Sequence, residues 1–329
     1  MAEKQHLLTV QDLRTYFYTR VGVVKAVDGV SFHLDAGEAL GMVGESGCGK
    51  SVTCHSIVRL LPPAGSHIVG GKILFEGDDL VQKKEREMKR WRGKQIGMIL
   101  QDPLVSLNPV HTIERQVGEA IRLDNRRQNK GFIRQKVIAM LERVMIPSAK
   151  LRLSQYPFQF SGGMRQRVLA AISLARQPKL IIADEPTTAL DVTIQDQFLR
   201  LLKELQRQYG LALLLVTHDL GLVAETCDRV AVMYAGRIVE TGSVEKVFDD
   251  PAHPYTRALM MALPELETKK KRLYQIQGEP PSLLNPPSGC SFSPRCSEVM
   301  EICRKEYPPS MPTEAGGVAA CWLWANRSD

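Results

Sequence analysis

The residues most suited to chemistry include Gly44 to Ser51, which read GESGCGKS and follow the apolar run Leu40 to Val43. Glycines at this spacing let backbone amides curl around phosphates, Lys50 adds a positive charge, and the Ser51 hydroxyl can bind Mg²⁺. The segment fits the P-loop pattern GxxxxGK(S/T) in full. It predicts nucleoside triphosphate binding, and a glycine-rich turn before a helix is the alternative.

A second segment, residues 160–191, reads FSGGMRQRVLAAISLARQPKLIIADEPTTALD. Ser161 is a natural N-cap, so a helix that starts here presents glycine-exposed amides to a phosphate. Leu180 to Ala183 is an unalternating apolar run, as expected of a strand buried on both faces. The run ends in Asp184, which can hold Mg²⁺, and Glu185, which can polarise an attacking water. A helix N-cap is the alternative role for Glu185.

Further elements are predicted around these segments. Apolar runs predict strands at Ile96–Leu100 and Ala212–Val216, and residues 7–43 alternate as in antiparallel strands. Helical periodicity marks Thr112–Leu123 and Phe132–Met145. Taken with the glycine-rich loop, the apolar strand that ends in Asp184 indicates a P-loop nucleoside triphosphatase.

Composition limits the class of protein. The chain has 329 residues, of which 44% are hydrophobic, enough for a large core and more than one unit. No run approaches the roughly 18 apolar residues of a membrane span. The start, MAEKQHLLTVQDL, has no apolar h-region, so a cytoplasmic protein is expected, touching a membrane only through separate subunits.

The net charge of +7 does not by itself indicate nucleic-acid binding. Residues 83–94 carry seven basic and two acidic side chains on a predicted helix. Such runs are usually solvated faces, and contact with acidic headgroups is the alternative. No interleaved aromatic platform or nucleic-acid motif accompanies the charge, so no direct nucleic-acid partner is expected.

On these motifs, the sequence resembles the ATP-binding subunits of ABC transporters over nearly its whole length. The resemblance implies an ATP-binding Walker A loop formed by Gly44, Glu45, Ser46, Gly47, Cys48, Gly49, Lys50 and Ser51. It implies that Mg²⁺ is held by Ser51, the Q-loop Gln101 and the Walker B Asp184. It assigns catalysis to Glu185, Gln101 and the switch histidine His218, and makes Asp191 the D-loop aspartate. Taken alone, His218 is an ordinary loop histidine, but a predicted strand delivers it to a sheet edge where phosphates should lie.

The same resemblance makes Ser161, Gly162, Gly163 and Met164 the signature motif, which acts on the ATP of a partner subunit. Phe160 and Met164 stand where leucine and glutamine are commoner in the family. The main phosphate contacts come from the Ser161 hydroxyl and the glycine amides, so these departures concern fine tuning. A single chain is therefore expected to be a poor ATPase until it pairs.

An early aromatic residue usually stacks on adenine in this family. Phe17 aligns best by spacing, with Tyr16 and Tyr18 as competitors, and a strand or core aromatic is the alternative.

The C-terminal part resembles the extension of dipeptide and oligopeptide permease ATPases, which nickel importers share. The resemblance is carried by the string HPYTRAL at 253–259, by GEPP at 278–281 and by GCSFSPRC at 289–296. From the residues alone, His253–Leu263 predicts a short helix that packs through Leu259, Met260 and Leu263.

Four of the seven cysteines, Cys290, Cys296, Cys303 and Cys321, cluster in this extension with spacing C-x5-C-x6-C-x17-C. Disulfides are disfavoured in a reducing cytoplasm, whereas four thiolates can hold a metal that supplies folding energy. Spacing leaves a 4Fe–4S cluster, zinc and unliganded structural cysteines open, and the permease resemblance favours the cluster. Cys48, Cys54 and Cys227 have no partner pattern and are expected to be small buried residues.

The resemblance implies an α/β P-loop (RecA-like) core with an antiparallel β subdomain and a helical subdomain at about 104–165, in a domain spanning 1–248. Residues 249–329 form the extension. The implied activity is ATP hydrolysis that powers import of dipeptides or oligopeptides at the cytoplasmic face of the membrane, with ATP and Mg²⁺ as cofactors. The implied partners are two transmembrane permease subunits, a related second ATP-binding subunit and an extracytoplasmic peptide-binding protein. A nickel or other small-solute importer is one alternative, and a soluble ABC ATPase that acts on nucleic acid or ribosomes is another.

Overall fold

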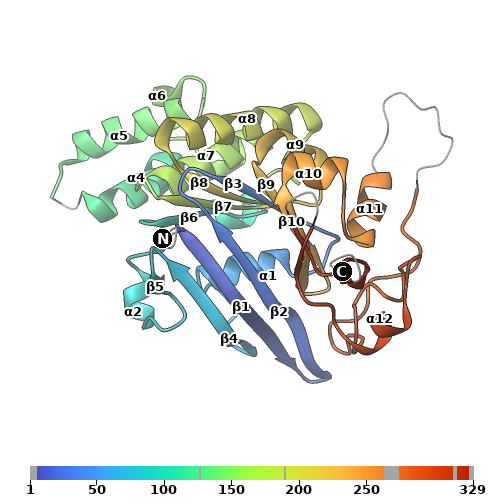
Figure 1. Cartoon of the computed structure of the whole chain (residues 1–329). Coiled ribbons are helices and arrows are strands. Elements are labelled where there is room, and N and C mark those ends of the chain that lie inside the picture. The colour runs from blue at the N-terminus through green and yellow to red at the C-terminus, as the bar shows by residue number, and fades with distance from the viewer. Residues whose placement is uncertain (1–5, 126, 189, 263–273, 314–316, 326–329) are drawn as a thin grey trace, which may run out of the picture. The chain divides into compact units, whose positions relative to one another are not determined.

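The computed structural model describes residues 6–125, 127–188, 190–262, 274–313 and 317–325, and the chain divides into two compact units (Figure 1). The first unit contains residues 1–34, 39–81 and 217–329, and the second contains residues 35–38 and 82–216. The predicted P-loop lies in the first unit. The predicted Asp-Glu pair and signature lie in the second.

The first unit holds a four-stranded antiparallel sheet and a second group of strands. Its elements before residue 82 are β1 (Leu8–Thr19), β2 (Gly22–Leu34), β3 (Ala39–Val43), α1 (Lys50–Ile57), β4 (Ser66–Phe75) and β5 (Asp78–Asp79). The antiparallel sheet has the order β2-β1-β4-β5. The alternation in residues 7–43 correctly predicted β1 and β2, but β4 and β5 were not predicted.

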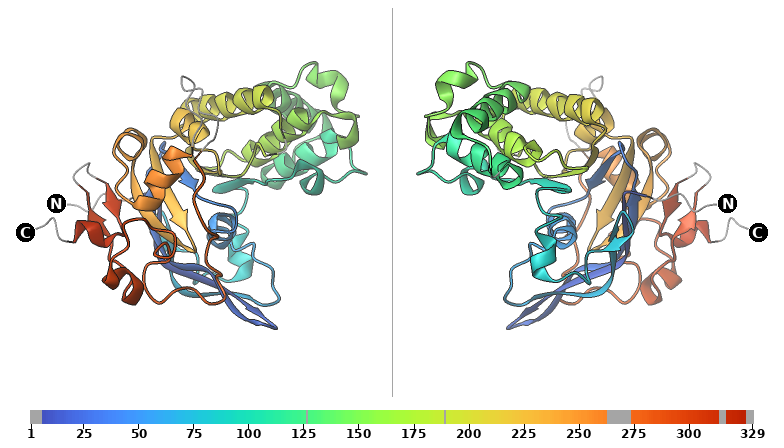
Figure 2. Two further views of the ribbon diagram at one scale, coloured as in Figure 1. Left: turned by 90° about the vertical axis from the view of Figure 1, so that its right-hand side faces the viewer. Right: turned by 90° about the vertical axis from the view of Figure 1, so that its left-hand side faces the viewer.

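The rest of the first unit comes from the C-terminal third of the chain. It comprises α9 (Leu220–Thr226), β9 (Arg229–Tyr234), β10 (Arg237–Ser243), α10 (Val244–Asp249), α11 (Pro254–Met261), α12 (Glu301–Lys305), β11 (Met311–Pro312), β12 (Val318–Ala319) and the 3-10 helix η2 (Trp322–Trp324). Strand β3 pairs in parallel with β9, and β9, β10, β12 and β11 follow as antiparallel neighbours. The C-terminal segments therefore extend the strand group that begins at the P-loop strand, as Figure 2 shows in red and orange.

The second unit combines a short parallel sheet with a group of helices. Its elements are α2 (Glu85–Met88), β6 (Ile96–Ile99), α3 (Pro103–Ser106), α4 (Ile113–Asp124), α5 (Lys130–Arg143), α6 (Ala149–Arg152), the 3-10 helix η1 (Pro157–Gln159), α7 (Gly162–Leu174), β7 (Leu180–Asp184), α8 (Val192–Tyr209) and β8 (Ala212–Val216). Strands β6, β7 and β8 are parallel, and every residue of β7 and β8 is buried. Burial on both faces explains why these strands show no alternation.

Two predictions about local structure were wrong in part. Within the basic run 83–94 only Glu85–Met88 is helical, because the run turns back on itself: Arg92 pairs with Glu85, and Gly93 has a φ of 72°. The helix predicted from His253 forms as α11, but it is buried through Tyr255 and Ala258, whereas Leu259 and Met260 are only half-buried. Leu263 lies outside the described residues.

Candidate functional site

The P-loop is a tight turn between a buried strand and a helix. All of β3 is buried, and α1 begins at Lys50 directly after Gly49, whose φ is 107°. The loop is braced by hydrogen bonds from the Cys48 amide to the Glu45 carbonyl (3.3 Å) and from the Gly236 amide to the Cys48 carbonyl (2.8 Å). These bonds hold the loop backbone between β3 and the start of α1, and a glycine-rich loop that leads into a helix N-terminus is the form of an anion site.

Lys50 places its charge inside that curve. Its side chain is buried, and its Nζ donates to the carbonyl oxygens of Gly44 (2.8 Å) and Glu45 (3.1 Å). A buried ammonium surrounded by loop carbonyls supplies a point charge that a phosphate can approach.

In the second unit, the end of β7 presents the predicted carboxylates. Asp184 is buried at the strand end, and Glu185 follows with a φ of 44° while its amide donates to the Val216 carbonyl (2.9 Å). The Glu185 carboxylate accepts hydrogen bonds from Gln101 Nε2 (3.1 Å) and Thr188 Oγ1 (3.0 Å). The structure thus brings Gln101 and Glu185 together.

Thr188 is a member of this group that the sequence prediction missed. It stands three residues after Glu185, and a hydroxyl at this spacing in a turn can reach back to the carboxylate. The two donors are a side-chain amide and a hydroxyl, both neutral groups, and together they orient the Glu185 carboxylate. An oriented carboxylate of this kind can accept a proton from water.

The signature motif and Asp191 meet where α7 contacts α8. The Ser161 hydroxyl caps α7 by accepting from the Met164 amide (3.3 Å), and the Asp191 carboxylate caps α8 by accepting from the Ile194 amide (3.0 Å). A Cβ at Gly163 would lie 2.4 Å from Ile194 Cγ2, so this contact requires glycine. Gly162 is the first residue of α7 and is half-buried; Ser161 before it is exposed, whereas Gly163 after it is buried.

His218 lies in the first unit and directly follows Thr217, whose amide is hydrogen-bonded to the P-loop strand β3. The amide of Thr217 donates to the Met42 carbonyl of β3 (3.2 Å), and the Thr217 hydroxyl accepts from the Asp219 amide (3.0 Å). The His218 side chain is exposed. This anchoring holds the backbone at His218 relative to the strand that leads into the P-loop.

The three early aromatics have different surroundings. Phe17 is two residues from Thr15 in β1 and so shares its face, and the Thr15 hydroxyl lies 2.8 Å from Ser56 Oγ of α1. Tyr16 donates to Asp28 (2.6 Å), and burial together with this hydrogen bond raises the pKa of Tyr16 to about 12. Tyr18 is exposed and contacts the His67 ring. Of the three, Phe17 is on the face that carries the P-loop helix.

The four clustered cysteines line one small cavity of about 10 Å³, together with His253 and Phe292. Burial, with a smaller contribution from the neighbouring cysteines, raises the pKa of the Cys290 and Cys296 thiols and raises that of Cys321 to about 12. Among the residues that the structure describes, no group of three or more His, Cys, Asp or Glu side chains is arranged to hold a metal ion. The structure therefore does not support the predicted metal centre as a formed ligand set. Cys48, Cys54 and Cys227 are buried, as predicted.

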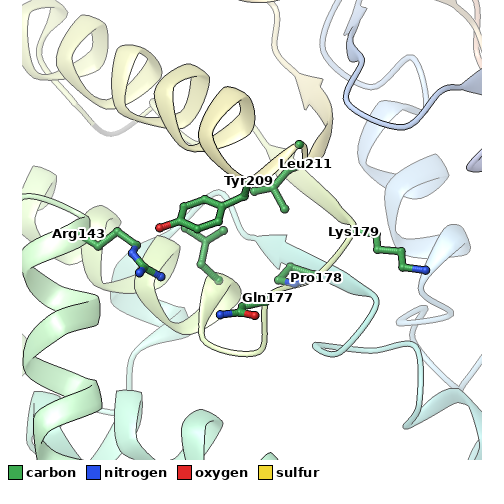
Figure 3. A pocket seen from close by; sticks show the side chains of 8 residues that line it. Arg143, Gln177, Pro178, Lys179, Tyr209 and Leu211 are labelled. Atoms are coloured by element: carbon green, nitrogen blue, oxygen red, sulfur yellow. The ribbon is translucent and has the colours of Figure 1, made fainter.

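A cavity of about 440 Å³ in the second unit is separate from all predicted motif residues (Figure 3). Its lining includes Arg143 and Tyr209, whose guanidinium and ring centroid are 4.8 Å apart. None of its lining residues carries a predicted role, so it adds nothing to the phosphate chemistry.

Two features of the site define a P-loop nucleoside triphosphatase. A buried strand runs into a glycine-rich loop with a buried lysine, and a second strand ends in the pair Asp184 and Glu185.

The ABC transporter family profile matches residues 27–188, and the profile "Oligopeptide/dipeptide transporter, C-terminal region" matches residues 239–303. The chain is 51% identical to the probable peptide ABC transporter ATP-binding protein y4tR of Sinorhizobium fredii, covering 96% of this chain and 94% of the relative. It is 47% identical to the dipeptide transport ATP-binding protein DppD of Bacillus subtilis, covering 99% and 97%.

A solved structure of the ATP-binding cassette MJ0796, bound to ADP and Pi, matches the fold with a TM-score of 0.65 and 24% identity, over 72% of this chain and 98% of that one. The chain belongs to the ABC transporter ATP-binding proteins, in their oligopeptide and dipeptide transport family. The predicted α/β P-loop fold class is thereby confirmed. Among the described residues, no helix is both long and apolar enough to cross a membrane.

Proposed function

We propose that this chain hydrolyses ATP to drive an ABC importer of dipeptides or oligopeptides, as its energy-coupling subunit. The observation that carries the proposal is that one chain matches both the ABC transporter family and the oligopeptide/dipeptide transporter C-terminal region. Relatives named for peptide and dipeptide transport match over nearly the full length. The substrate need not touch this chain, because ATP-driven closure of two such subunits can move separate membrane subunits. The proposed domain division is 1–248 for the ATPase and 249–329 for the extension.

The proposed roles of the site residues follow from their chemistry. Lys50 and the amides of the P-loop bind the phosphates of ATP, while Ser51, Gln101 and Asp184 complete the Mg²⁺ shell. Glu185 activates the attacking water and His218 stabilises the γ-phosphate. Phe17 stacks on adenine, and the signature residues Ser161 to Met164 serve the ATP of a partner subunit, with Asp191 beside them. The hydrogen bond between Gln101 and Glu185 supports a shared role at the reacting phosphate.

The proposed partners are two transmembrane permease subunits, a related second ATP-binding subunit and an extracytoplasmic peptide-binding protein. The chain would then lie at the cytoplasmic face of the membrane as a peripheral protein. Leu104, Val105 and Val110, which follow Gln101, are 62%, 84% and 74% exposed, and this supports a protein contact beside the Q-loop.

Purification from gently solubilised membranes tests this proposal. We expect two membrane-spanning permease subunits and a second ATPase to copurify with the full chain, detected by mass spectrometry. ATP hydrolysis by that complex in vesicles should rise when a peptide-loaded binding protein is added. Copurification without any integral membrane protein would contradict the transporter proposal, and stimulation by nickel instead of peptide would contradict the substrate class.

We further propose that Cys290, Cys296, Cys303 and Cys321 hold a metal centre. Four sulfurs around one cavity match the donor set of zinc and of a 4Fe–4S cluster, and a bound cation would stabilise these buried thiols as thiolates. A cavity of about 10 Å³ admits a single ion, whereas a cluster requires the side chains to move outward. When bound, either group would tie four chain segments together and add folding energy.

Metal analysis decides between these centres. Protein purified without oxygen is expected to contain about four iron and four sulfide, or one zinc, per chain, with a matching fall in the Cys303→Ser variant. Removal of the metal should lower the thermal stability of the extension. A folded wild-type chain without iron, sulfide or zinc would leave these residues as structural cysteines and overturn the proposal.

A further inference from the structure

The C-terminal extension contacts the P-loop directly, through Arg295, the arginine of the string GCSFSPRC. Arg295 donates to both carboxylate oxygens of Glu45, at 2.7 and 3.0 Å, and Glu45 is the second residue of the P-loop. The two residues are 250 positions apart in the sequence. Paired, parallel hydrogen bonds of this kind fix orientation as well as charge.

Arg295 is itself held rigidly. Its side chain is 4% exposed, and it also donates to the Tyr234 hydroxyl (3.2 Å) and to the Gln277 carbonyl (3.0 Å). The hydrogen bond to Glu45 is the main cause that raises the pKa of Arg295, so the guanidinium stays charged. Because the guanidinium is also hydrogen-bonded to Tyr234 and Gln277, its position is fixed, and it restrains the position of Glu45.

A second residue of the extension holds the backbone of the same P-loop position. The Glu45 amide donates to the hydroxyl of Tyr255 (2.9 Å), a fully buried side chain of α11. On the loop side, the Glu45 carbonyl accepts from Lys50. The carbonyl also accepts from the Cys48 amide, so side chain, amide and carbonyl of Glu45 are all engaged. Two of the four partner residues, Arg295 and Tyr255, lie beyond residue 248.

The negative charge of Glu45 lies in the phosphate-binding loop, and Arg295 pairs with it. A carboxylate in a loop that must attract phosphates repels them, and the repulsion is strong where solvent is partly excluded. The Glu45 side chain is 26% exposed, so water alone screens its charge incompletely. Pairing with Arg295 neutralises the charge and holds the carboxylate in one orientation.

We propose that Arg295 is a positioning residue for the phosphate-binding loop, by which the C-terminal extension sets the affinity of the chain for ATP. The inference rests on the proposed binding of ATP by this loop. It gives the extension a part in the ATPase cycle that the cassette motifs do not contain.

The same contacts link the P-loop to the cysteine cavity. The Phe292 ring packs against Tyr234 (5.3 Å between centroids) and Tyr255 (5.4 Å), and Phe292 also lines the cavity. Arg295 directly precedes Cys296, in the short segment that begins at Cys290. Phe292 and Tyr255 therefore connect the cysteine cavity to the Glu45 amide by side-chain packing and one hydrogen bond.

The test is a double-mutant cycle in ATP binding, measured on the full chain with Mg²⁺ and ATP under conditions without turnover. We expect Arg295→Ala to weaken ATP binding about tenfold, because the Glu45 carboxylate then faces the phosphates unpaired. Adding Glu45→Gln to Arg295→Ala should recover most of that loss, since no charge is left to neutralise. The matched control is Lys305→Ala, which removes an exposed ion pair with Glu301 in the same extension and should leave ATP affinity unchanged.

The outcomes separate the inference from its alternatives. Unchanged affinity in Arg295→Ala overturns it, and a loss that Glu45→Gln does not recover assigns Arg295 a merely structural role, which also overturns it. Should Arg295→Ala fail to fold, Arg295→Lys and Arg295→Gln decide: the lysine variant is expected to bind within about threefold of wild type and the glutamine variant about tenfold more weakly. Equal ATP affinities for the lysine and glutamine variants would contradict the idea that residue 295 acts by neutralising the Glu45 carboxylate. A wild-type chain that does not bind ATP at all would instead refute the proposed function.

Discussion

Replacing Glu185 with Gln should leave ATP binding intact and lower the rate of ATP hydrolysis by about 10²–10⁴-fold, the usual contribution of a positioned general base. Glutamine has the same shape, and its amide oxygen can still accept from Gln101 and Thr188, the two donors that orient Glu185. Only the ability to take a proton from water is lost. The measurement is ATP turnover and ATP affinity in the assembled complex, because the chain alone is expected to be a poor ATPase.

The control for this substitution is Glu204→Gln, which makes the same change on an exposed face of α8. It should retain wild-type turnover. Substantial hydrolysis by the Glu185→Gln complex would remove Glu185 from the proposed role, whereas loss of ATP affinity in that variant would indicate that the carboxylate acts in binding and not in proton transfer.

Much of the fold could be predicted because the buried strands are continuous apolar runs. The runs at Leu40, Leu180 and Ala212 predicted β3, β7 and β8 within about one residue, and a predicted site residue lies within two residues of the end of each strand. Parallel strands covered on both faces carry this signal locally, without reference to distant residues. By contrast, β4 carries glycines and exposed positions, and it forms by pairing with β1 rather than through its own pattern.

The contacts that hold the site residues were harder to predict, because they join distant positions. The sequence identified Glu45 as a P-loop residue, but nothing near it indicates that Arg295 and Tyr255 would bind it. The sequence predicted a short helix that packs through Leu259 and Met260, whereas in the structure Tyr255 is the large side chain that this helix buries. Spacing did indicate that the four cysteines converge, and they line one cavity, but spacing carries no information on the room left for a metal.

The glycines of the P-loop differ in a way that the motif does not reveal. The pattern GxxxxGK(S/T) specifies glycine at position 44 and leaves position 47 open, although this chain has glycine at both. In the structure, a Cβ on Gly44 would lie 2.1 Å from the Met233 carbonyl oxygen of β9, whereas a Cβ on Gly47 meets nothing within 4 Å. Gly47 requires glycine only because its φ is 78°. One glycine is therefore needed for packing against a strand and the other for backbone conformation.

Gly44→Ala is accordingly expected to lower the free energy of unfolding by about 2–4 kcal/mol, from overpacking together with backbone strain, and to abolish measurable ATP binding as the loop is displaced from β9. Gly47→Ala serves as the matched variant and should cost only about 1 kcal/mol, the cost of a left-handed alanine. Urea unfolding and ATP titration of both variants check the difference. Equal destabilisation by the two alanines would mean that backbone conformation alone accounts for both glycines, and that contact with β9 does not fix the start of the P-loop.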